Sequence, residues 1–124
     1  TRFAIAGGNP ANAIDIETVA GGKRAKQGAG SVHHIAFSVA NAEAQRAVRK
    51  ALIETGYQVT PSIDRDYFQA IYFRSPGGIL FEVATDEPGF DRDEDSASLG
   101  TALKLPKQHE HLRAELEAEL EPLD

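Results

Sequence analysis

The sequence predicts an α+β protein built around one β-α-β-β-β unit. Segments 32–39 and 79–84 alternate large apolar residues with small or polar ones, a period of two that is typical of β-strands. Between them, residues 42–55 carry apolar side chains at the spacing of a helix. Turn signals mark two more strands between this helix and the second segment. We expect an N-terminal hairpin before the unit and a helical strap after it.

The first part of the chain is predicted to be a hairpin followed by a linker. Segments 2–6 and 13–19 are the predicted strands, joined by the turn-rich residues 7–10. Residues 21–30 are rich in glycine and form the predicted linker. Because the hairpin stands outside the β-α-β-β-β unit, we expect it to be the end of a preceding module.

The helix and strands of the central unit have recognisable ends. Asn41 suits an N-cap and Gly56 suits the C-terminal cap of the helix at 42–55. Its buried stripe is predicted at Ala44, Ala47, Val48, Ala51 and Leu52. The remaining strands are predicted over 57–61, 69–74 and 79–84, with a connection at 62–67 and a tight turn at 75–78.

The C-terminal third differs in composition from the rest. Residues 85–124 carry 12 acidic and 4 basic side chains, whereas residues 1–84 carry 7 acidic and 9 basic ones. Residues 86–98 therefore look like an acidic loop, and 100–106 like an apolar tether. A helix is predicted over 107–121 and expected to pack as a strap on the outside of the domain. Its apolar side carries Leu112, Leu116 and Leu120.

The composition excludes several classes of function. The 124 residues are 41% hydrophobic, which suits one small domain. A net charge of −6 without basic stripes argues against nucleic acid as the main partner. No apolar run approaches the roughly 20 residues that span a bilayer, and we expect neither a membrane segment nor a signal peptide. The absence of cysteine fits a reducing compartment, so we expect a cytoplasmic protein.

Strand periodicity places candidate ligands on one face of the sheet. His34 and Glu82 both lie opposite the large apolar residues of their strands, and Tyr72 has the same parity one strand over. An imidazole and a carboxylate on neighbouring strands suit Fe(II), Mn(II), zinc or nickel. A second histidine would complete the facial set of two histidines and one carboxylate.

A structural interpretation of the same residues stays open. His34 would then be a hydrogen-bonded core histidine and Glu82 an ion-paired inner carboxylate. A carboxylate within Ile-Leu-Phe-Glu-Val-Ala, however, needs a highly charged partner to offset its desolvation. His109 and His111 are expected to face solvent, because a spacing of two places them on different sides of a helix.

Four segments of the chain form a recognisable set. They are His33-His34-Ile35-Ala36-Phe37, Asp64-Arg65-Asp66-Tyr67-Phe68, the run 71–82 and the run 84–90. Together they resemble the vicinal oxygen chelate (glyoxalase/bleomycin resistance/extradiol dioxygenase) superfamily, and most of all its hydroquinone- and catechol-type ring-cleaving dioxygenases. The resemblance covers nearly the whole chain, but only the C-terminal part of a family enzyme. It implies a βαβββ module of the vicinal oxygen chelate type.

The resemblance also implies roles for individual residues. His34 and Glu82 match the family's metal ligands, with Fe(II) as the implied cofactor and Mn(II) as the other candidate. Tyr72 matches a tyrosine that hydrogen-bonds a substrate oxygen. Arg65 resembles an arginine that approaches the ring, although a surface or structural role stays open. His33 resembles a pocket neighbour, although an ideal strand would point it away from His34. The implied partners are a small aromatic substrate and O₂.

One ligand of the implied set is missing. In the family the remaining histidine comes from another module, so this chain holds two ligands of three. The chain begins with Thr1 rather than methionine, and we expect a fragment, a processed product or a trimmed form that is inactive alone. One β-α-β-β-β unit by itself also leaves one face of its sheet uncovered, so we expect a homodimer or pairing with an N-terminal half.

Two alternative functions stay open. One is a non-catalytic small-molecule binding module of the same fold, against which the retained ligands argue. The other is a glyoxalase-like metal-dependent isomerase or lyase, which the Asp-Arg-Asp-Tyr-Phe stretch resembles less well. The chain is predicted to divide into three parts. Residues 1–30 are the end of a preceding module plus linker, 31–85 the metal-binding module, and 86–124 the acidic loop and C-terminal helix.

Overall fold

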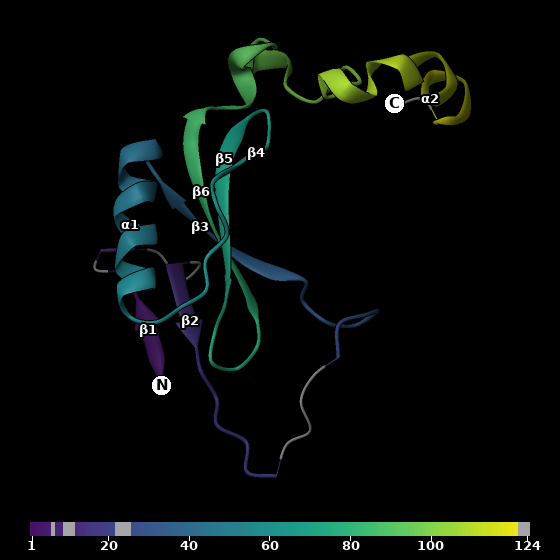
Figure 1. Ribbon diagram of the computed structural model, residues 1–124. Helices are drawn as coiled ribbons and strands as arrows, with labels where there is room; N and C mark the ends of the chain where they lie inside the picture. The colour runs from purple at the N-terminus through teal and green to yellow at the C-terminus, as the bar shows by residue number, and fades with distance from the viewer. Residues whose placement is uncertain (6, 9–11, 22–25, 122–124) are drawn as a thin grey trace. The chain divides into compact units, whose positions relative to one another are not determined.

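The computed structural model describes residues 1–5, 7–8, 12–21 and 26–121 (Figure 1). Ala6 of the predicted first strand, residues 9–10 of its turn and residues 22–25 of the predicted linker lie outside the described residues. The chain forms two compact units, Thr1–Ser31 and Val32–Asp124. Among the described residues, no helix has both the length and the apolar character needed to cross a membrane.

The first unit contains an antiparallel hairpin of two short strands, β1 (Arg2–Ala4) and β2 (Ala13–Asp15). Arg2 and Asp15 face each other, and two hydrogen bonds of 2.8 and 2.6 Å join their side chains. Both strands are shorter than predicted. The register pairs Asp15 with Arg2, and the Ile16 N–H bonds the Thr1 carbonyl. Residues 17–19 therefore have no opposite residue in the hairpin.

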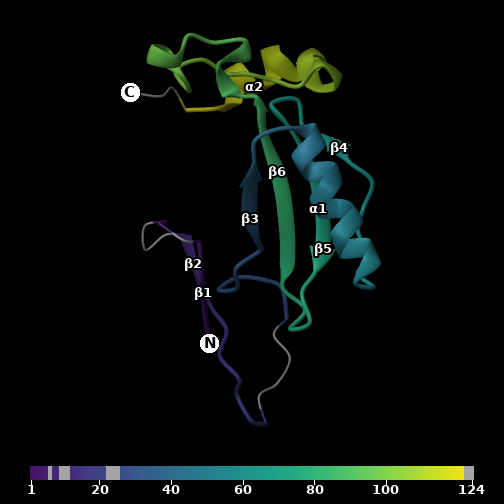
Figure 2. The same cartoon turned by 90° about the vertical axis from the view of Figure 1, so that its left-hand side faces the viewer.

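The second unit is a four-stranded sheet with a helix along one face (Figures 1 and 2). Its strands are β3 (His34–Val39), β4 (Ile63–Asp64), β5 (Phe68–Arg74) and β6 (Leu80–Pro88), and its helix is α1 (Ala42–Glu54). The strand order is β3-β6-β5-β4. β3 runs parallel to β6, and the other neighbours are antiparallel. The predicted α+β class and β-α-β-β-β order are confirmed.

The strand predicted at 57–61 is wrong, and β4 takes its place in the sheet. The Thr60 N–H bonds the Tyr72 carbonyl at 3.0 Å, but the Tyr72 N–H bonds the hydroxyl of Thr60 rather than a carbonyl. The carbonyl oxygens of Val59 and Thr60 accept from the guanidinium of Arg49 on α1. Since side chains occupy these backbone groups, the segment lies beside β5 without forming a ladder.

Two boundaries near the C-terminus also differ from the prediction. β6 continues four residues beyond the predicted end at 84, because Phe68 of β5 pairs with Pro88. The helix predicted over 107–121 is α-helical only in α2 (Arg113–Glu119), after a 3₁₀ helix at Lys107–Leu112. The Arg113 N–H bonds the Glu110 carbonyl, which is the tighter 3₁₀ spacing.

Helix α1 begins and ends where expected but buries a different stripe. The Asn41 side chain accepts from the Ala44 N–H at 3.0 Å, and Gly56 has the positive φ of 91° that favours glycine. Ala47 and Ala51 are exposed, contrary to prediction, whereas Gln45 is only 2% exposed.

Gln45 is buried because its side chain hydrogen-bonds backbone carbonyl groups of the sheet beneath the helix. The pairing of β5 with β6 is irregular between Phe68 and Ala70. The Gln45 side-chain nitrogen donates to the carbonyls of Gln69 and Val83, at 2.7 and 2.9 Å, and its oxygen accepts from Ser62. An alanine could satisfy none of these groups.

We predict that Gln45→Leu lowers the free energy of unfolding by about 2–3 kcal/mol, because it leaves buried carbonyl oxygens without donors. Urea unfolding followed by circular dichroism measures the change. The control is Arg46→Leu on the exposed side of the same helix. Equal unfolding midpoints for the two variants would contradict this account of Gln45.

Candidate metal and substrate site

The strand register brings the sequence-predicted residues onto one face of the sheet. Ala36, Glu82 and Tyr72 lie opposite one another across β3, β6 and β5. The neighbouring row contains His34, Leu80 and Arg74. Side chains alternate between faces along a strand, so both rows share a face. Along β3 this face is exposed, while the alternate positions are partly buried.

Glu82 is the buried centre of this face. Its carboxylate lies on the middle strand β6 and is only 5% exposed. One oxygen lies 3.0 Å from Nε2 of His34, and the other accepts from the Tyr72 hydroxyl at 3.0 Å. The His34 side chain remains 38% exposed. The cluster therefore joins a buried carboxylate to an imidazole that solvent can reach.

Tyr72 links Glu82 to Arg65. The Arg65 Nε–H donates to the Tyr72 hydroxyl oxygen at 3.1 Å, and the guanidinium carbon lies 5.5 Å from the centre of the ring. Burial raises the pKa of Tyr72; the Arg65 hydrogen bond opposes this and the Glu82 carboxylate adds to it. The phenol therefore stays protonated at neutral pH and can donate a hydrogen bond.

A tight turn holds Arg65 in place. Asp66 has a positive φ of 69°, and its N–H donates to the Asp64 side chain at 2.8 Å. Arg92, from the 3₁₀ helix Phe90–Arg92, binds both the carbonyl and the carboxylate of Asp66. The sequence reasoning missed this support, because nothing in the spacing of Asp66 and Arg92 indicates their contact.

His33 lies beside His34 rather than pointing away from it. Strand β3 begins at His34, so strand alternation does not apply to His33. The two Nδ1 atoms are 2.8 Å apart, and the rings meet edge to face. Only one of the two nitrogens can carry the shared proton, so this contact couples the tautomers of the two rings.

The donor types at the centre of this face, an imidazole nitrogen and a carboxylate oxygen, suit a divalent metal. Within the part of the chain that the structure describes, no group of three or more histidine, cysteine, aspartate and glutamate side chains could hold an ion. His34 and Glu82 supply one nitrogen and one oxygen. His109 and His111 are exposed, as predicted.

One further pair on this face was also missed. The Ser38 hydroxyl donates to the carboxylate of Asp86 at 2.5 Å. The signal was available, because both residues have the same parity as His34 and Glu82. It was overlooked because residue 86 was predicted to lie in a loop rather than in β6.

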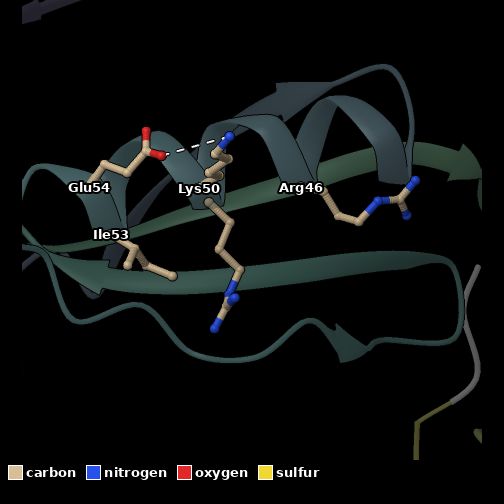
Figure 3. Close-up of a pocket in the computed structure, with 5 residues that line it drawn as sticks. Arg46, Lys50, Ile53 and Glu54 are labelled. Carbon is tan, nitrogen blue, oxygen red and sulfur yellow. Dashed lines mark ion pairs between the residues drawn. The ribbon is translucent and has the colours of Figure 1, made fainter.

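A separate hollow lies on the outer surface of α1. Its volume is about 420 Å³, and Figure 3 shows Arg46, Lys50, Ile53 and Glu54 around it. Lys50 and Glu54 form an ion pair of 3.8 Å there. None of its lining residues belongs to the Glu82 cluster, so this hollow is not the candidate site.

We predict that Tyr72→Phe lowers the free energy of unfolding by about 1–3 kcal/mol, because the buried Glu82 carboxylate loses the hydrogen bond that the Tyr72 hydroxyl donates. Urea unfolding measures the change. Tyr67→Phe is the matched control, since its hydroxyl bonds the exposed Asp93. A larger loss in the control than in Tyr72→Phe would argue against the Glu82 interaction.

Known proteins resemble this chain in sequence. Residues 2–83 match the family described as "Glyoxalase/Bleomycin resistance protein/Dioxygenase superfamily". The "Putative ring-cleaving dioxygenase MhqO" of Bacillus subtilis is 45% identical over 117 residues, which cover 94% of this chain and 37% of that protein. The "Chlorohydroquinone/hydroquinone 1,2-dioxygenase" of Sphingobium indicum is 38% identical over 119 residues, which cover 93% of this chain and 36% of that protein.

A solved structure shares the fold. The crystal structure of a "putative dioxygenase from Bacillus subtilis" matches with a TM-score of 0.85 and 44% identity, over 99% of this chain and 39% of that one. The chain thus spans little more than a third of the length of these relatives. With the family match extending over residues 2–83, the resemblance inferred from the sequence is confirmed. This chain belongs to the glyoxalase/bleomycin resistance/dioxygenase superfamily.

Proposed function

We propose that this chain is the C-terminal portion of a non-haem Fe(II)-dependent dioxygenase that cleaves the ring of a hydroquinone or catechol with O₂. The observation that carries the proposal is the continuous set of contacts from His34 through Glu82 and Tyr72 to Arg65. The names of the relatives support ring cleavage, and one of them names hydroquinone.

His34 and Glu82 are the residues that would hold the metal, with Fe(II) preferred and Mn(II) as the other candidate. When bound, the ion supplies Lewis acidity and orients the substrate oxygens and O₂. The third protein ligand would come from the longer remainder that the relatives possess. His33 would support this arrangement. When His34 binds an ion through Nε2, which faces Glu82 in the structure, its remaining proton sits on Nδ1, and Nδ1 of His33 can accept it.

Tyr72 and Arg65 would act on the substrate oxygens. The Tyr72 hydroxyl can turn from Glu82 to donate to a substrate oxygen, and the Arg65 Nε–H bond to its oxygen makes that hydroxyl a stronger donor. The guanidinium of Arg65 would add positive charge near the ring oxygens as negative charge develops on them. These two residues would hold protons and charge, while His34 and Glu82 would hold the ion.

The test measures iron content and O₂ uptake with hydroquinone and with catechol, using this chain joined to the remainder of a family enzyme. We expect His34→Ala and Glu82→Ala to lose both iron and turnover. Tyr72→Phe should keep the iron and react about 100-fold more slowly, the cost of losing one oxyanion donor. His109→Ala, at an exposed histidine, is the control and should retain both.

Three results would count against this proposal. Full iron occupancy in the Glu82→Ala protein would remove Glu82 from the ligand set. Rapid turnover by the 124-residue chain alone would mean that two ligands suffice. Tight binding of the aromatic ring without O₂ uptake, in iron-loaded protein, would favour a binding module instead.

The proposal includes a cytoplasmic location and association through the open sheet. β3 and β4 are the two edges of the sheet, and the face that carries His34 is partly exposed. Unpaired edges and open faces favour association. We predict that sedimentation at micromolar concentration gives a homodimer, or a complex with the remainder of the enzyme when this is supplied. A monomer under both conditions would contradict this prediction.

A further inference from the structure

A second hollow lies next to the Glu82 cluster. Its volume is about 450 Å³, and it is lined by residues 58–60 and by Tyr72, Phe73, Arg74 and Leu80. This volume lies within the range of small-molecule sites. Backbone and hydroxyl hydrogen bonds between Thr60 and Tyr72 hold the two sides of the hollow together.

The strand register connects this hollow to the candidate ligands. Leu80 lies between His34 and Arg74 in one row, and the adjacent row contains Glu82 and Tyr72. Same-face residues on one strand are about 7 Å apart, which is comparable to the length of one substituted ring. A ring held at His34 and Glu82 can therefore extend over Leu80 toward Arg74.

Arg74 determines the chemistry of the hollow, because it is the charged residue among those that line it. Its Nη1 donates to the Gly78 carbonyl at 3.0 Å, which anchors the guanidinium at the turn before β6. No acidic partner of Arg74 occurs among the described residues. The remaining N–H groups of an anchored guanidinium are suited to a carboxylate or sulfonate.

The other candidate positions are less suited to an anion. The hollow beside Arg65 is also lined by Asp64 and Asp66, whose carboxylates would repel one. The hollow on α1 shares no residue with the cluster.

We propose that Arg74 and Leu80 form a subsite for an anionic substituent on the aromatic ring. This inference rests on the proposed function and adds a substrate class to it.

The experiment compares binding of 2,5-dihydroxybenzoate, 2,5-dihydroxybenzenesulfonate and unsubstituted hydroquinone, by calorimetry and by amide and Arg side-chain NMR shifts. The protein is the iron-loaded chain joined to the remainder of the enzyme. We expect about fivefold tighter binding of both anionic rings, the scale of an exposed ion pair. The preference should shrink in 0.5 M salt, because salt screens exposed charges.

The variants separate charge from structure. Arg74→Gln should abolish the preference, and Arg74→Lys should retain part of it because the charge remains. Arg46→Gln, which removes an exposed arginine of α1, should leave the preference as in the parent protein. Equal affinity for the three rings in the parent protein, or an undiminished preference in Arg74→Gln, would overturn the subsite.

Failure of this inference is distinguishable from failure of the proposed function. O₂ uptake with hydroquinone in a protein that lacks the anionic preference would retain the dioxygenase and reject the subsite. An Arg74-dependent preference in a protein without O₂ uptake would retain the subsite as a binding feature and reject the dioxygenase.

Discussion

The buried carboxylate of Glu82 is the constraint on which the arrangement of the site depends. A charged group that is 5% exposed loses most of its hydration, and this loss must be offset by hydrogen bonds or opposite charge. His34 and Tyr72 supply one contact to each oxygen, from the strands on either side. The same contacts place an imidazole, a carboxylate and a phenol within reach of one another. The contacts that stabilise the buried carboxylate are therefore the same contacts that assemble the candidate site.

Side chains also complete the sheet wherever its backbone pairing fails. Gln45 and Thr85 satisfy the backbone of Gln69 at the irregular start of β5. Arg49 does the same for the carbonyl oxygens of Val59 and Thr60, in the segment that was predicted to be a strand, and the Thr60 hydroxyl accepts from the Tyr72 N–H of β5. Buried backbone groups require partners, so these polar residues are needed in positions where the helical and strand patterns favour apolar ones.

The acidic C-terminal region contributes to the site through its few basic and aromatic residues. Arg92 ties down Asp66 in the turn that positions Arg65. Phe90 stacks on Tyr67, next to the same turn. The region thus supports a loop whose arginine reaches the Tyr72 hydroxyl, although most of its charges face solvent. A description of this segment by its net charge alone overlooks that role.

The sequence by itself determined the features that depend on local geometry. Strand alternation places His34, Tyr72 and Glu82 each opposite the large apolar residues of its own strand, and α1 is capped by the side-chain oxygen of Asn41 and by the positive φ of Gly56. Only the tertiary structure decided how distant segments meet. It set the strand register that pairs Glu82 with Tyr72, the burial of Gln45, and the ion pair between Arg92 and Asp66. It also decided that residues 57–61 form no strand. These outcomes depend on which backbone groups lack partners after the sheet has formed, and no local pattern encodes that.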